Sequence, residues 1–147
     1  MVVSTRDGHV LGHVPTVARP RAVRWTRRGL AGMFVAGAAG HAVFASVTPE
    51  IYEAFADGAQ FAAVREAWRD LFVPHARLLA AGLAVFELGL GVLFALGGRR
   101  ATRVAVAGAI AFHVALVAFG WWYLLWSVPM LGLLIWFDRN TRDRGAA

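Results

Sequence analysis

The sequence contains no cysteine among its 147 residues. This absence excludes structural disulfides, thiolate metal sites and thiol redox chemistry carried by the chain itself. It leaves the redox compartment undecided, because cysteine usage is the usual indicator of compartment. Lysine is absent as well, so all 15 basic side chains are arginines.

The sequence also lacks the motifs of common soluble enzymes. It has no phosphate-binding loop, no dinucleotide fingerprint, no G-x-S-x-G and no H-E-x-x-H. No internal repeat of the kind that builds a solenoid or a propeller is found. These absences give no support to a soluble enzyme or a repeat protein.

Hydrophobic residues make up 59% of the chain, and they are concentrated in long runs. A soluble domain is nearer to about 45–50% apolar. The composition therefore predicts an all-α, polytopic membrane protein with a four-helix bundle in residues 28–137. The predicted spans are approximately 29–47, 78–96, 102–119 and 121–137.

The arginines flank these runs and account for most of the net charge of +6. Six lie at or before Arg28, three in the turn 97–103 and three after residue 137, whereas residues 48–77 hold three arginines against five acids. The positive-inside rule then predicts a cell-membrane protein with both termini in the cytoplasm. Residues 1–27 are expected to form a mobile basic tail and residues 138–147 a second tail. This pattern favours contact with anionic lipid headgroups and excludes nucleic acid as the partner.

Residues 48–75 are expected to lie outside the cytoplasm as an amphipathic segment. Thr48 and Pro49 are typical of a helix start, and Gly58 of a helix end. A second helix is predicted over residues 60–73, too charged to span and suited to an interface. It either covers lipid-facing surface or caps a cavity.

Glu87 lies in the middle of the apolar run 78–96. A carboxylate near a membrane midplane costs at least about 2.5 kcal/mol unless it is paired, protonated or hydrated. The helical rise places His41 and His113 about 10 Å, and Glu87 about 14 Å, below the outer surface. These three residues are the candidate ligand-binding site if each faces inward, and no catalytic residue is assigned.

Several chemistries fit these side chains. An imidazole and a carboxyl group could hold a quinone carbonyl and exchange a proton with it. The weaker alternatives are a b-type haem between His41 and His113, and a metal held by all three residues. In a purely structural interpretation Glu87 fixes helix register, and each histidine bonds a carbonyl or the hydroxyl of Ser46 or Ser127. His9 and His13 have metal-compatible spacing, but their segment shows no helical period.

Small residues recur every four positions in two of the predicted spans, which lets helices pack closely. One row lies in the first span and the other in the third. The rows are Gly32, Ala36 and Gly40, and Ala107, Ala111 and Ala115.

The stretch FELGLGVLFALGGRRA at residues 86–101 resembles a hallmark of DoxX-like membrane proteins. In that family a glutamate is followed by a glycine, an apolar stretch and a basic turn. GHAVF at 40–44, followed by PEIY at 49–52, is similar to one branch of the family. The resemblance implies a bundle of four membrane helices associated with redox systems, with functional positions at Glu87, Gly91 and His41.

Three functions therefore remain open. The first is an accessory or quinone-interacting subunit of a membrane redox system, in contact with other redox subunits or with copies of itself. The second is a structural or assembly subunit without a small ligand, and the third is a binder of a lipid-like molecule. Inverted repeats and paired broken helices, which typify secondary transporters, are absent from the sequence.

Overall fold

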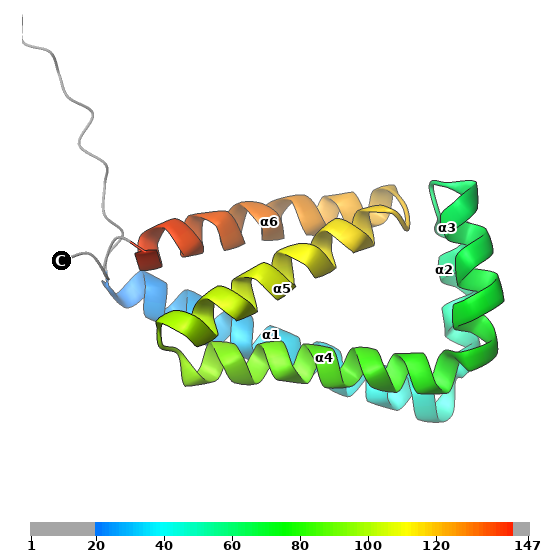
Figure 1. The fold of residues 1–147 in the computed structure, drawn as a ribbon, viewed down its shortest axis with the longest axis horizontal. Coiled ribbons are helices and arrows are strands. Elements are labelled where there is room, and N and C mark those ends of the chain that lie inside the picture. Colours follow the sequence, from blue (N-terminus) through cyan, green and yellow to red (C-terminus); the bar gives the residue numbers. More distant parts are fainter. Residues whose placement is uncertain (1–19, 143–147) are drawn as a thin grey trace, which may run out of the picture.

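The computed structural model describes residues 20–142, which are helical throughout apart from short turns and contain no strand. The long helices are α1 (Pro20–Val47), α4 (Ala76–Leu96), α5 (Arg99–Val117) and α6 (Trp121–Arg142). Figure 1 shows α1 and α4 side by side along one edge, α6 along the other, and α5 running diagonally from the end of α4 to the start of α6. The all-α prediction is confirmed for this part of the chain.

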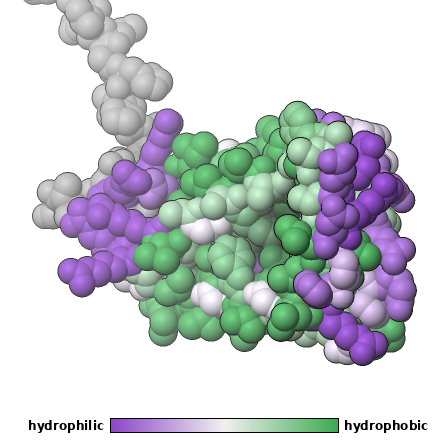
Figure 2. Space-filling view, turned by 45° about the vertical axis from the view of Figure 1, so that its right-hand side comes forward, coloured by the Kyte–Doolittle hydropathy of each residue, from purple (hydrophilic) through white to green (hydrophobic). Residues whose placement is uncertain are grey.

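Three helical stretches are long and apolar enough to cross a membrane: Arg21–Val47, the part of Ala62–Leu96 that contains α4, and Arg99–Val117. Helix α6 is not among these stretches; it contains four tryptophans and Pro129. Figure 2 shows hydrophilic residues gathered at the two ends of the molecule and hydrophobic residues between them. This banding is what a bilayer-embedded helical protein requires.

A short charged segment crosses one end of the long helices (Figure 1). It comprises the 3₁₀ helix η1 (Pro49–Tyr52), α2 (Glu53–Gly58), α3 (Ala62–Ala67), a π-helical turn η2 (Trp68–Phe72) and the 3₁₀ helix η3 (Val73–His75). We call residues 49–75 the cap segment. Pro74 has no N–H to continue the helical ladder, so the chain bends there and enters α4 in a new direction.

The cap segment is fastened to the turn between α5 and α6. The Gln60 backbone N–H donates to the Ala118 carbonyl at 2.9 Å, and Gln60 Nε2 donates to the Val117 carbonyl at 2.8 Å. Gly58 and Gly120 touch there, because a Cβ built on Gly120 would lie 2.8 Å from the Gly58 carbonyl oxygen. Gln60 thus satisfies carbonyls that the end of α5 leaves without helical partners.

Several helices extend beyond the spans predicted from the sequence. Helix α1 begins at Pro20 rather than residue 29, so residues 20–27 are helical and not a tail; Val23 of this extension is buried. Helix α6 continues to Arg142, because an ion pair between Arg142 and Asp138 at 2.7 Å and a bond from Thr141 to the Asp138 carbonyl extend it. Helix α5 begins at Arg99.

The cap segment also differs from the prediction in detail. Thr48 occupies the N-cap position but makes no side-chain capping bond. The predicted single helix over 60–73 begins at Ala62 and widens into the π-helical turn at Trp68. Leu71, within this turn, is 64% exposed.

The apolar core has two parts. The larger part joins all four long helices around Phe34, Leu90, Phe94 and Leu134. The smaller part lies under the cap segment, where Tyr52, Ala76 and Ala80 are buried against partly buried aromatic rings. The candidate polar site lies beside Tyr52.

Candidate functional site

Helices α1 and α4 approach each other closely because glycines on both helices leave room. A Cβ built on Gly91 of α4 would lie 2.8 Å from Val35 Cγ2 and 3.1 Å from the Ala31 carbonyl oxygen. A Cβ built on Gly37 of α1 would lie 2.7 Å from Glu87 Oε2. The two backbones therefore enclose the Glu87 carboxyl group, whose residue is 5% exposed.

His41 stands one helical turn after Gly37 and so shares its face of α1. Its Nε2 lies 3.8 Å from Glu87 Oε2, which is too long for a hydrogen bond. Its Nδ1 makes a hydrogen bond of 2.7 Å with the Tyr52 hydroxyl. The His41 side chain is 20% exposed against 6% for Glu87, so His41 is the accessible side of the pair.

Tyr52 reaches this position because the chain reverses after Val47 and η1 folds back over the end of α1. Its ring stacks on His41 with centroids 5.9 Å apart, and the residue is 1% exposed. The Tyr52 carbonyl accepts a 2.7 Å bond from Trp68 Nε1, which holds η1 against the π-helical turn. Burial, and after it the negative charge of Glu87, raise the pKa of the Tyr52 hydroxyl above its ordinary value.

The resulting row is Tyr52, His41 and Glu87, which we call the polar row. Among the described residues, Glu87 Oε2 is buried without a hydrogen-bond partner. Buried polar atoms in native proteins usually have a partner, so an exception is informative. A single oxygen or nitrogen atom of a ligand could contact both Glu87 Oε2 and His41 Nε2 across their 3.8 Å separation.

His113 belongs to a different cluster. It is 1% exposed on α5, and its Nδ1 lies 3.4 Å from Ser127 Oγ on α6. Its Nε2 has no hydrogen-bond partner within residues 20–142, and the rings of Phe34 and Phe112 pack edge-on against it. The structure thus brings His41 and Glu87 together and leaves His113 without a hydrogen bond to either. Ser46 and Ser127 were the two serines predicted to bond a histidine. Ser127 lies beside His113, whereas the Ser46 hydroxyl donates to the Ala42 carbonyl.

Residues 20–142 contain no group of three histidine, cysteine, aspartate or glutamate side chains placed to hold a metal ion. A metal bound jointly by His41, His113 and Glu87 therefore has no support in this structure. His9 and His13 lie outside the described residues.

The small-residue rows predicted for packing lie mostly on the outside. Gly32, Ala36, Ala107 and Ala111 are exposed, and a Cβ on Gly32 or Gly40 would meet nothing within 4 Å. Among the positions named from the sequence, Gly91 does pack. The contacts inside the chain instead involve Gly37 on α1 and the fully buried Ala105 and Ala109 on α5.

Sequence reasoning missed Gly37 and assigned Tyr52 no role at the site. The signal for Gly37 is its position four residues before His41, which predicts a shared helix face. Tyr52 carries no comparable signal, because its contact with His41 depends on the chain reversal at Thr48.

Comparison with protein-family models, curated proteins and solved structures gave no match. The resemblance to DoxX-like proteins, and the roles it implies for Glu87, Gly91 and His41, accordingly stay predictions.

Proposed function

We propose that this chain is a small integral membrane protein whose polar row binds the head group of a quinone-type ligand, as an accessory subunit of a membrane redox system. The observation that carries this proposal is the unpartnered, buried Oε2 of Glu87, which lies 3.8 Å from Nε2 of the partly exposed His41 side chain. An intramembrane carboxyl group is by default a functional-site hypothesis. The sequence resemblance to DoxX-like proteins points to the same class.

The polar row has the groups that such a ligand requires. A quinone carbonyl accepts a hydrogen bond from an N–H or O–H, and it takes up a proton when electrons reduce it. His41 can donate from Nε2 while its Nδ1 accepts from the Tyr52 hydroxyl, and Glu87 can hold or release a proton beside it. The electrons would come from a redox cofactor of a partner subunit, so the role of this chain is to bind the head group and to move protons.

We further propose four membrane crossings, with both ends of the chain on the cytoplasmic side and the cap segment outside. The arginine distribution supports this orientation. Helix α6 is the fourth crossing: it is 22 residues long and buries Ser127, Met130, Leu134 and Phe137 in the bundle. Its tryptophans suit the membrane interface.

Binding can be tested by native mass spectrometry of the protein extracted gently from a quinone-containing membrane. We expect a quinone adduct on the unchanged protein and about tenfold weaker retention in Glu87→Gln and His41→Gln, since each change removes a charge-assisted or buried hydrogen bond. Glu66→Gln is the matched control, because Glu66 is an exposed acid of the cap segment. Equal retention in all three variants would reject the polar row as the binding site.

A structural or assembly subunit is the second candidate, and the exposed small-residue row on α1 favours it. Such a row can receive a helix from another chain. This function predicts that Gly32→Leu abolishes copurification with a larger membrane complex while Glu87→Gln leaves it intact. The quinone proposal predicts no effect of Gly32→Leu on quinone retention.

A further inference from the structure

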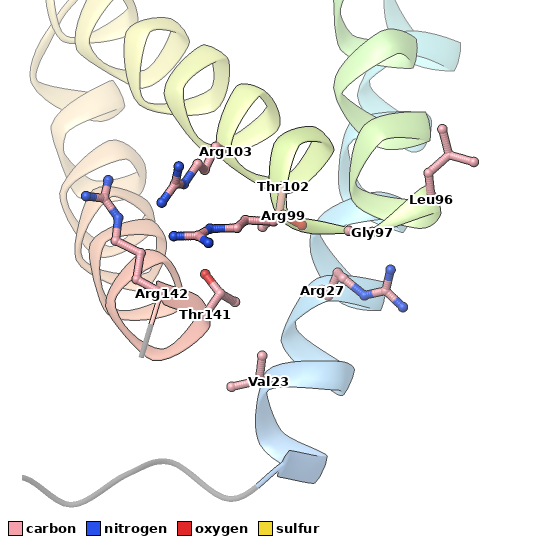
Figure 3. A pocket seen from close by; sticks show the side chains of 10 residues that line it. Val23, Arg27, Leu96, Gly97, Arg99, Thr102, Arg103, Thr141 and Arg142 are labelled. Carbon is pink, nitrogen blue, oxygen red and sulfur yellow. The ribbon is translucent and has the colours of Figure 1, made fainter. Parts of the chain in front are cut away.

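A cavity of about 480 Å³ lies at the arginine-rich end of the molecule, remote from the polar row. It is bounded by the start of α1, the turn between α4 and α5 and the end of α6 (Figure 3). Four arginines line it, and none of its lining residues is acidic: Arg27, Arg99, Arg103 and Arg142. Its volume is typical of a small-ligand site.

The four arginines are not equivalent. Arg27 donates to the carbonyls of Phe94 and Ala95 at 3.2 and 3.1 Å, and so caps the end of α4. Arg142 is paired with Asp138. The side chains of Arg99 and Arg103 form no hydrogen bond or ion pair within residues 20–142. Figure 3 shows Arg99 and Arg103 extending from α5 toward α6 and Arg142 lying along α6, while Arg27 points away from them.

Arg99 and Arg103 are four residues apart on α5, so two like charges face each other on one side of a helix. Such a pair destabilises a helix unless a counter-ion lies between the charges. An anion in the cavity would remove this repulsion. The repulsion between Arg99 and Arg103 therefore favours anion binding at this position, in addition to the general positive charge of this end of the molecule.

Two further donors point to an anion. Helix α5 begins after Gly98, which lines the cavity and has no side chain to cap the helix, so the first N–H groups of α5 have no side-chain partner there. Thr102 lines the same cavity, is 7% exposed, and its hydroxyl makes no hydrogen bond within the described residues. The hydroxyl is therefore free to donate to a ligand in the cavity.

We propose that this cavity binds a phosphate group through Arg99, Arg103, Thr102 and the first turn of α5. The group is carried either by an anionic phospholipid or by a soluble phosphate. Leu96 lines the cavity and is 73% exposed, which provides apolar surface for an acyl chain. Figure 2 also places the polar end directly next to the apolar band, where a lipid headgroup lies.

The lipid arm of the test is native mass spectrometry of the full chain offered phosphatidylglycerol and phosphatidylcholine at equal concentration. We expect preferential retention of phosphatidylglycerol, reduced about tenfold or more in Arg99→Gln/Arg103→Gln and about fivefold in Thr102→Val. Arg24→Gln/Arg100→Gln is the matched control, because it removes the same charge from exposed positions that do not line the cavity.

The second arm measures thermal unfolding in phosphatidylcholine nanodiscs with inorganic phosphate against chloride at the same ionic strength. Stabilisation by phosphate that the pocket variants lose and the control keeps supports the site with a soluble ligand. Equal loss in both double variants, or no preference for phosphatidylglycerol and no effect of phosphate, overturns the proposal. If circular dichroism shows that Arg99→Gln/Arg103→Gln does not fold, the loss of binding in Thr102→Val alone tests the proposal.

Discussion

Gly37 has a hydrogen atom where any other residue would have a Cβ, and the Glu87 carboxyl group occupies the space that this leaves. A methyl group at residue 37 would overlap Glu87 Oε2, at 2.7 Å. Because the overlapping atoms are the end of the Glu87 side chain, which can shift, we expect Gly37→Ala to destabilise the protein by about 1 kcal/mol, the lower end of the cost of overpacking. The measurement is thermal unfolding in a mild detergent.

Gly32→Ala is the control on the same helix, because its added Cβ meets nothing within 4 Å. It should be neutral or stabilise by up to about 1 kcal/mol through helix propensity. In a Glu87→Ala background the cost of Gly37→Ala should largely disappear, since the overlapping group is gone. A cost that is unchanged in that background would show that Gly37 does not accommodate Glu87.

Tyr52 gives a prediction about pH. Burial and the charge of Glu87 raise its pKa in the folded protein, so the unfolded chain loses this proton first as the pH rises. The stability contributed by neutral Tyr52 is complete below about pH 10, the ordinary tyrosine pKa, and is lost as the pH rises through the folded value. The chain has only two tyrosines, so tyrosinate absorbance in a Tyr123→Phe background reports Tyr52 alone.

In that background Glu87→Gln should bring the Tyr52 pKa part of the way back, because it removes the smaller of the two causes and leaves the burial. A Tyr52 pKa that does not respond to Glu87→Gln would mean that the two side chains are not coupled.

At the scale of the elements, the Trp68 indole joins the two halves of the cap segment. Its Nε1 donates to the Tyr52 carbonyl at 2.7 Å, and its ring stacks on Phe72 with centroids 3.8 Å apart. Trp68→Phe keeps an aromatic ring and removes the hydrogen bond, which is worth about 1 kcal/mol. We expect trypsin to cleave after Arg65 and Arg69 about fivefold faster, since opening of the segment becomes easier by that amount.

Trp122→Phe is the control for this experiment, because Trp122 is 68% exposed and its aromatic contact is with its neighbour Trp121. Equal cleavage rates in Trp68→Phe and the unchanged protein would show that the indole bond does not hold the cap segment closed.

Some helix bounds could be predicted from the sequence, whereas the glycines that pack between helices could not. Helix α4 was located closely because its apolar run is uninterrupted. The start of α1 was missed because Arg21, Arg24 and Arg27 hide the helical run from a hydropathy argument. On α1, glycine and alanine lie on more than one face, so spacing alone could not choose Gly37 over Gly32 and Gly40. That choice depends on how α4 is rotated, which only the packed structure specifies.

The candidate site was partly predictable for a related reason. Glu87 and His41 were identified by the cost of a polar group in an apolar run. Their distance and the separate position of His113 depend on helix rotation. Tyr52 depends on a chain reversal over several residues. Chemical type could thus be read from the sequence, whereas side-chain partners required tertiary contacts.

At the scale of the whole molecule, the open question is how many times the chain crosses the membrane. Three helical stretches meet the requirement by length and composition, and α6 packs beside α5. The absence of cysteine makes single-cysteine labelling clean, because every thiol is then an introduced one. Suitable sites are Glu66 in the cap segment, Arg100 in the turn between α4 and α5, and Arg139 near the end of α6, all exposed.

We expect a membrane-impermeant maleimide to label Glu66→Cys in intact cells, and Arg100→Cys only after permeabilisation, because the arginine-rich end should face the cytoplasm. The labelling of Arg139→Cys tests whether α6 is a fourth membrane crossing. If α6 spans the bilayer, this position behaves like Arg100→Cys. Labelling of Arg139→Cys from outside would place the end of α6 with the cap segment, and the four-crossing arrangement would be wrong. Labelling of Arg100→Cys from outside would reverse the orientation and move the arginine cavity to the opposite leaflet.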